Sequence, residues 1–318
     1  MDPIVFIYLV SLSLNVVTSG ISGLFLFFSA WHNRAARSLA YCDFGWMFWS
    51  GSHFVAIVAP TEAVSVLAWQ IGFFGLLAGC VFFADFAARL VEEHNKVSYR
   101  VFQRVIYTFT LTIAGILLSD LLFETNIILS SSVSPRLWFD QWLVPGRFLT
   151  AFIGFFLFCF SLAYVYFFLG YKQSKEKVFQ QTILLLFWTT IVPAIGGSTQ
   201  YLIWYDVPLL PLGGFTIPVY VFGVLYAATR FHLFNAKVIT AELFTIIIWM
   251  ITFGRILVAR DSFEFTVSIG VFLLTLFFGL LTIRSVITEV KQKDSLEQVT
   301  KELDHANKNL ADLNSNLE

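Results

Sequence analysis

Five ionisable side chains fall inside long apolar stretches of this chain, where they could exchange protons, bind a ligand or pair with one another. They are Asp43, His53, Asp85, Asp120 and Arg255. A charged group near the centre of a bilayer costs about 2.5–3.5 kcal/mol on insertion scales, so it needs a partner, a water-filled cavity or a function. Asp43, Asp85 and Asp120 lie near the ends of their stretches, where we expect acidic groups at the membrane surface. His53 and Arg255 are the main candidates for sensing a signal, and Asp120 is a further one.

The two most interesting of these candidates, His53 and Arg255, also have simpler explanations. His53 could line an outward-opening pocket with nearby tryptophans, or these aromatic rings could simply pack or face lipid. The tryptophans are Trp46, Trp49 and Trp69. Arg255 could pair with Asp120 or Asp261 across helices, because a buried cation persists when an opposite charge is near.

A cluster of helix-breaking residues marks two later apolar stretches. It comprises Pro193, Gly196, Gly197, Pro208, Pro211, Gly213, Gly214 and Pro218. Proline removes a helical hydrogen bond and glycine allows helices to approach closely, so we expect kinks here. Gln200 and Asp206 lie nearby and could contact a ligand. The pattern predicts either a ligand pocket that includes Pro193, Gln200, Asp206 and Pro218, or ordinary packing irregularities.

The elements that position these residues are membrane helices. Hydrophobic residues make up 58% of the 318 residues and charged residues only 13%, which is too apolar for a water-soluble surface. Stretches of about 20 apolar residues predict a polytopic, all-α bundle of about nine spans. They run from Ile4 to Ala30, Leu39 to Ala59, Val64 to Phe86, Val101 to Leu122, Phe148 to Leu169, Ile183 to Ile203, Leu212 to Ala228, Leu243 to Ala259 and Phe265 to Ile283.

Charge distribution predicts the orientation of these spans. Most Lys and Arg residues near the predicted helix ends fall on one side, and only Arg136, Arg147, Arg255 and Arg260 fall on the other. The positive-inside rule then places the N-terminus outside and the C-terminus in the cytoplasm of a cell membrane. The sizeable outer loop, 123–147, contains Trp138, which we expect with Trp142 to anchor at the membrane interface.

The chain beyond Ile283 changes to a polar sequence without Pro or Gly, so the last membrane helix is expected to continue into the cytoplasm. Apolar residues then alternate at steps of three and four, the seam of a coiled coil and most simply of a parallel homodimer. The seam comprises Leu296, Val299, Leu303, Ala306, Leu310, Leu313 and Leu317. The register slips between Ile283 and Leu296, and the pattern stops without a cap at Glu318, so we expect the coil to be incomplete.

This organisation resembles the N-terminal seven-helix sensor region of bacterial membrane histidine kinases. The matching stretches are ATRFHLFNAKVITAELF, FGLLTIRSVITEVKQKDSLEQ and TKELDHANKNLADLNSNLE. The resemblance implies a seven-helix sensor region over residues 1–231, two further helices over 232–283 and a signalling coil over 284–318. It also implies that kinase domains follow the coil. His305 lacks the following Pro of that family's phosphoacceptor site, so this part of the chain is expected to be non-catalytic.

The expected function is therefore a membrane-embedded sensory input module that passes a stimulus through its last span to a dimeric coil. The alternatives are a small-molecule transporter, or a sensor with a different output such as a nucleotide cyclase. We expect the bilayer, a second copy and a small apolar ligand as partners, and no nucleic acid. No Lys lies inside a span, which argues against a retinal Schiff base, and Cys42, Cys80 and Cys159 form no metal or disulfide pattern. No cofactor or metal is expected.

Overall fold

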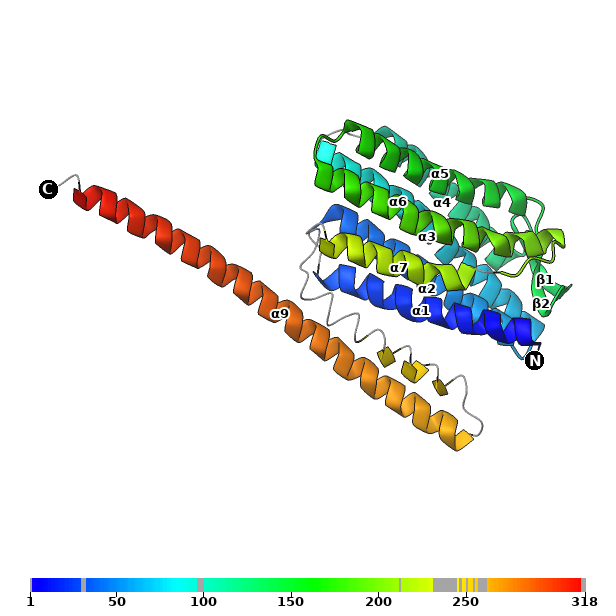
Figure 1. Ribbon diagram of the computed structural model, residues 1–318. Helices are drawn as coiled ribbons and strands as arrows, with labels where there is room; N and C mark the ends of the chain where they lie inside the picture. The colour runs from blue at the N-terminus through cyan, green and yellow to red at the C-terminus, as the bar shows by residue number, and fades with distance from the viewer. Residues whose placement is uncertain are drawn as a thin grey trace. The chain divides into compact units, whose positions relative to one another are not determined.

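The computed structural model describes residues 2–29, 33–95, 100–211, 213–230, 245, 248–249, 251–253, 255–256 and 262–315 (Figure 1). Nearly all described elements are helices. In chain order they are α1 (Pro3–Ser29), α2 (Arg34–Val58), α3 (Glu62–Asn95), α4 (Arg100–Phe123), the strands β1 (Leu129–Arg136) and β2 (Phe139–Pro145), α5 (Leu149–Gln173), α6 (Lys177–Ser198), the 3-10 helix η1 (Thr199–Tyr205), α7 (Gly213–Arg230) and α9 (Ser262–Ser315). The chain divides into two compact units, Met1–Phe234 and Asn235–Glu318.

Six of the described helices are long and apolar enough to cross a membrane. They cover Pro3–Phe27, Glu62–Glu92, Gln103–Phe123, Leu149–Gln173, Lys177–Tyr205 and Phe263–Val286. The surface of α4 is too apolar to face water: Phe109, Leu111 and Leu122 each expose more than half of their surface. The helices α2 and α7 occupy the second and seventh predicted spans, and much of the eighth lies outside the described residues. The multi-pass character is supported, while the total of nine stays a prediction.

The first unit is a bundle in which α1 to α7 run side by side, with the strands at one end (Figure 1). Glycine permits a close backbone contact between α2 and α3. A Cβ atom placed on Gly45 would lie 2.8 Å from the carbonyl oxygen of Gly75 and 2.5 Å from the backbone nitrogen of Gly79. Small residues allow such close backbone approach, which maximises van der Waals packing where lipid removes the usual hydrophobic driving force.

The loop predicted over 123–147 contains a β-hairpin, so the predicted all-α class needs this correction. The strands β1 and β2 are antiparallel and pair Val133 with Leu143. Trp142 is completely buried, because the hairpin folds its ring into the end of the bundle; its predicted role as an interface anchor is therefore wrong. Trp138 is half-buried. In the turn between the strands, Leu137 has a φ of 50°, a left-handed conformation that glycine adopts more readily.

The second unit is dominated by α9, a single helix of 54 residues. Its apolar first part packs against the preceding helical residues: Trp249 donates its indole N–H to the carbonyl of Thr275 at 2.7 Å, and Phe253 contacts Phe272. The helix then continues without a break through the change from apolar to polar sequence. The unbroken exit helix expected from the sequence is therefore confirmed as far as Ser315.

Candidate functional site

A cavity lies inside the first unit, between α1, α2, α3, α5, α6 and α7. Its volume is about 50 Å³, several times the roughly 10–15 Å³ that one water molecule requires. Aromatic rings form much of the wall, including Trp46, Trp49, Phe83, Phe156 and Phe160. The described residues that line it include no charged side chain. Such a wall suits a small, mainly apolar molecule.

Few polar groups reach this cavity, and they come from different helices: Asn15 from α1, Ser50 from α2, Thr190 from α6, Gln200 from η1 and Tyr220 from α7. Apolar walls with a small number of hydrogen-bonding groups are typical of ligand sites, because the polar groups fix the ligand's orientation. The arrangement can bind and orient a molecule.

Three of the eight helix-breaking residues singled out from the sequence line this cavity. Pro193 and Gly197 line it from α6, and Gly213 lines it from the start of α7. A Cβ atom on Gly213 would lie 3.0 Å from the Cα atom of Gly197, so the two helices approach closely there. Pro218 lies further along α7, at a position whose side chain is outside the described residues.

His53 lies beside the cavity rather than on its wall. Its ring centroid is 3.9 Å from that of Trp69, 4.8 Å from Trp49 and 5.2 Å from Trp142. Only 1% of the residue is exposed. The packed alternative fits these contacts, whereas an outward-opening pocket at His53 does not.

A polar contact links this aromatic cluster to the cavity wall. The Tyr8 hydroxyl lies 3.4 Å from Nδ1 of His53 and donates to Oε1 of Gln200 at 3.3 Å. These residues come from α1, α2 and η1, which are far apart in the sequence. A molecule that displaces Gln200 in the cavity would therefore disturb the Tyr8–His53 pair.

Asn15 and Ser50 form a second polar contact between α1 and α2. The Asn15 amide donates to the hydroxyl of Ser50 at 2.5 Å, and its carbonyl oxygen accepts from Ser19 at 2.8 Å. All three residues are buried. Serine and asparagine occur at many other positions in the spans, so the sequence alone does not distinguish these three residues.

The Asp120 carboxylate is hydrogen-bonded to the backbone at the start of the hairpin. Its carboxylate accepts from the Thr125 hydroxyl at 2.6 Å and from the backbone N–H groups of Ile127, Ile128 and Leu129 at 2.7, 2.8 and 2.9 Å. It does not line the cavity. The geometry assigns this candidate to the connection from α4 into β1.

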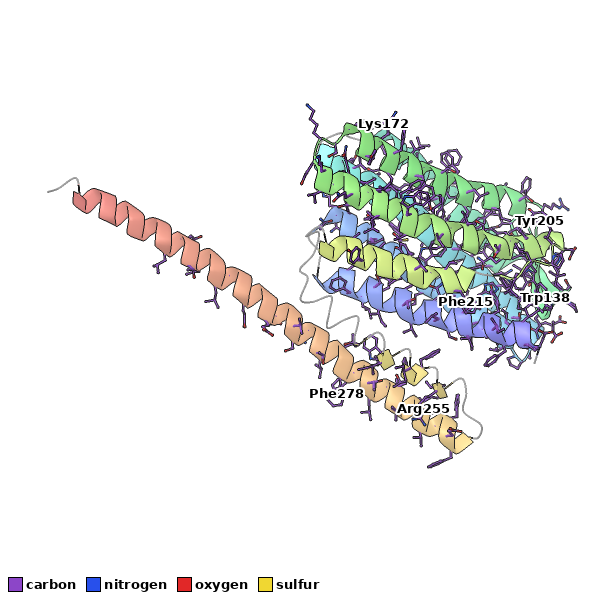
Figure 2. All side chains as sticks on the ribbon, viewed as in Figure 1. Trp138, Lys172, Tyr205, Phe215, Arg255 and Phe278 are labelled. Carbon is purple, nitrogen blue, oxygen red and sulfur yellow. The ribbon has the colours of Figure 1, made fainter. Side chains whose placement is uncertain are left out.

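Asp206 joins the end of η1 to the hairpin. Arg136 donates from both Nε and an Nη atom to its two carboxylate oxygens, each at 2.8 Å. The neighbouring guanidinium lowers the pKa of Asp206 and the carboxylate raises that of Arg136. Figure 2 shows Trp138 and Tyr205 at this end of the first unit and Lys172 at the opposite end.

Arg255 belongs to the second unit, where it lines a separate cavity of about 160 Å³ with Glu264 and Ser268 (Figure 2). Of its two predicted partners, Asp261 lies outside the described residues. The other, Asp120, already accepts four hydrogen bonds in the hairpin connection. Arg255 therefore belongs to a different unit from Pro193 and Gln200.

The predicted coil seam lies on α9 as far as Leu313, and Leu317 lies outside the described residues. Leu296, Val299 and Leu303 expose 66%, 58% and 60% of their surface. The side chains of Ala306, Leu310 and Leu313 are outside the described residues.

Comparison with known proteins does not identify a function for this chain. No family model matches the chain, and no curated protein or solved structure matches it. Within the described part of the chain, no group of three or more His, Cys, Asp or Glu residues is placed to hold a metal ion. The cavity of the first unit and the exposed seam of α9 are therefore the features from which a function is inferred.

Proposed function

We propose that this protein is the membrane-embedded sensory input module of a bacterial signal-transduction histidine kinase. In this proposal nine helices cross the cell membrane, with the N-terminus outside and the C-terminus in the cytoplasm. A small, mainly apolar molecule occupies the cavity between α1, α2, α3, α5, α6 and α7. Its binding is passed to α9, which pairs with α9 of a second copy.

The observation on which this proposal rests is the continuity of α9. One helix carries an apolar segment long enough to cross a membrane and, further along, leucines at coiled-coil spacing. Leu296, Val299 and Leu303 leave about 60% of their surface uncovered in a single chain. A second α9 in parallel register would cover them, because the seam positions of the two copies face each other in such a dimer.

The chemistry of the cavity supports a binding role over a catalytic one. Its described wall is aromatic and aliphatic, with amide and hydroxyl groups as the polar contacts. A transporter would be expected to use broken helices in related halves of the chain and ion-coordinating groups at mid-membrane depth. The change from α-helix to 3-10 helix between α6 and η1 fits that pattern in part, but the exposed seam has no role in a transporter.

Disulfide crosslinking in native membranes tests the dimer. Single cysteines are placed at the seam position Leu303 and at the outward positions Lys301 and Lys308, in a background where Cys42, Cys80 and Cys159 are replaced by alanine. A parallel coil predicts rapid crosslinking at position 303 and slow crosslinking at 301 and 308, because only seam residues meet across the dimer. Equal rates at the three positions would contradict the dimeric sensor and favour the transporter.

A further inference from the structure

Among the described residues of the first unit, three carboxylates are buried, and two of them have several hydrogen-bond partners. Asp120 accepts four hydrogen bonds in the hairpin connection. Asp85 on α3 pairs with Arg89 at 2.5 Å and also accepts from Ser38 and Gln103. Each therefore has the compensation that a buried charge requires. The third, Asp43 on α2, differs from both.

Asp43 is 0% exposed, and none of the described basic side chains pairs with it. One carboxylate oxygen, Oδ1, accepts from the Tyr220 hydroxyl of α7 at 2.7 Å. The other, Oδ2, has no hydrogen-bond partner among the described residues. The Ser22 hydroxyl of α1 lies beside the same carboxylate, where a small shift lets it donate to Oδ2. The carboxylate of Asp43 is thus surrounded by hydroxyl groups but by none of the described basic side chains, so its negative charge stays uncompensated in a buried place.

We propose that Asp43, Ser22 and Tyr220 form a binding site for a monovalent cation such as sodium. Hard cations prefer oxygen ligands, and the site offers a carboxylate and two hydroxyls from three different helices. Its charge sets the valence: a single carboxylate is neutralised by one positive charge, whereas a divalent ion would leave an excess positive charge in an apolar interior. The cation would also tie α1, α2 and α7 together.

Tyr220 gives this site a connection to the cavity, because the residue lines the cavity and its hydroxyl contacts Asp43. Asn15 and Ser50 line the same cavity. Their oxygens and that of Tyr220 would replace water ligands of a cation that enters through the cavity. The cation site does not depend on the proposed sensory function. A transporter with the same residues would contain it equally.

The test is the thermal unfolding of the purified full chain in detergent, in sodium chloride and in N-methyl-D-glucamine chloride at equal ionic strength. Sodium binding that raises the folding equilibrium constant tenfold raises Tm by about 2 °C for a chain of this size. We expect this shift in the wild type, none in Asp43→Asn, and a higher sodium requirement in Ser22→Ala. The matched control is Ser13→Ala, another buried serine of α1, whose hydroxyl bonds to the Leu9 carbonyl and which should keep the full shift.

Three outcomes would overturn the proposal. A wild-type Tm that is the same in both salts would show that the folded protein does not bind sodium. A full sodium-dependent rise in Tm in Asp43→Asn would show that sodium binds at a site without Asp43. The third is an infrared band of a protonated carboxyl group that disappears in Asp43→Asn while Tm stays independent of sodium, which would show that a proton neutralises the carboxylate. If Asp43→Asn fails to fold, Ser22→Ala and Tyr220→Phe provide the same comparison.

Discussion

Replacing Asp120 by asparagine should destabilise the hairpin connection without touching the cavity. Each carboxylate oxygen accepts two hydrogen bonds, and Oδ2 accepts from the N–H groups of Ile128 and Leu129. Asparagine keeps one acceptor oxygen and replaces the other with an NH₂ group, which is itself a donor. Two buried donors then lose their acceptor, at about 1–3 kcal/mol each. The expected loss in free energy of unfolding is therefore about 2–6 kcal/mol.

Thermal unfolding in detergent and limited proteolysis together measure this effect. The Asp120→Asn variant should unfold at a lower temperature and should be cleaved faster between Thr125 and Arg147. Asp140→Asn is the matched control, because Asp140 lies in the same hairpin but is exposed. Unchanged Tm and cleavage in Asp120→Asn, combined with an altered response at the seam of α9, would refute the structural role and restore Asp120 as a sensing residue.

Three further substitutions or conditions test the packing. Gly45→Ala should lower the free energy of unfolding by about 1–3 kcal/mol through overpacking, whereas Gly115→Ala, with open space around its Cβ, should not; melting curves of the pair decide this. Leu137→Gly should stabilise the hairpin by about 1 kcal/mol, because glycine adopts the left-handed backbone of this position without strain. An unchanged Tm would contradict this prediction. Because the pKa of Asp206 is lowered in the folded state, its contact with Arg136 should persist above the ordinary value of 3.8 and be lost below it. Proteolysis of the hairpin as a function of pH should therefore accelerate only in that acidic range, and Asp206→Asn should weaken this pH dependence, leaving the part that depends on the Asp120 carboxylate.

Most helices can be predicted from the sequence, because a run of about 20 apolar residues is enough to indicate a membrane helix. Most of α1, α3, α4 and α5 falls within the predicted spans, and the last span runs on into polar sequence as expected. The hairpin was not predicted, because residues 130–132 are three serines and the segment lacks the strict alternation of a half-buried strand. The burial of Trp142 depends on rings from α2, α3 and η1, which local sequence cannot reveal.

The cavity was partly predictable. Proline and glycine mark irregular helices, and Pro193 and Gln200 do line the cavity. Asp43 was expected at the membrane surface but is completely buried, because α7 covers it with Tyr220, 177 residues further along the chain. A contact over that separation leaves no local signal. Asp120 and Asp206 were noticed as charges, but their partners are set by the hairpin that the sequence did not predict.

The central claim is that the cavity is coupled to the pairing of α9 between two copies. Its most direct test introduces a side chain into the cavity and measures how fast the two copies crosslink at the coil. Gly197→Leu places a side chain into the cavity from a position with open space at its Cβ, and Gly154→Leu is the control, because Gly154 has equal space but is exposed on α5. Each is combined with Leu303→Cys, and the rate of disulfide formation between copies is measured in native membranes. Coupling between cavity and coil predicts a change of at least about fivefold in Gly197→Leu and none in Gly154→Leu. Equal rates in both variants and in the parent would contradict a sensor that signals through α9.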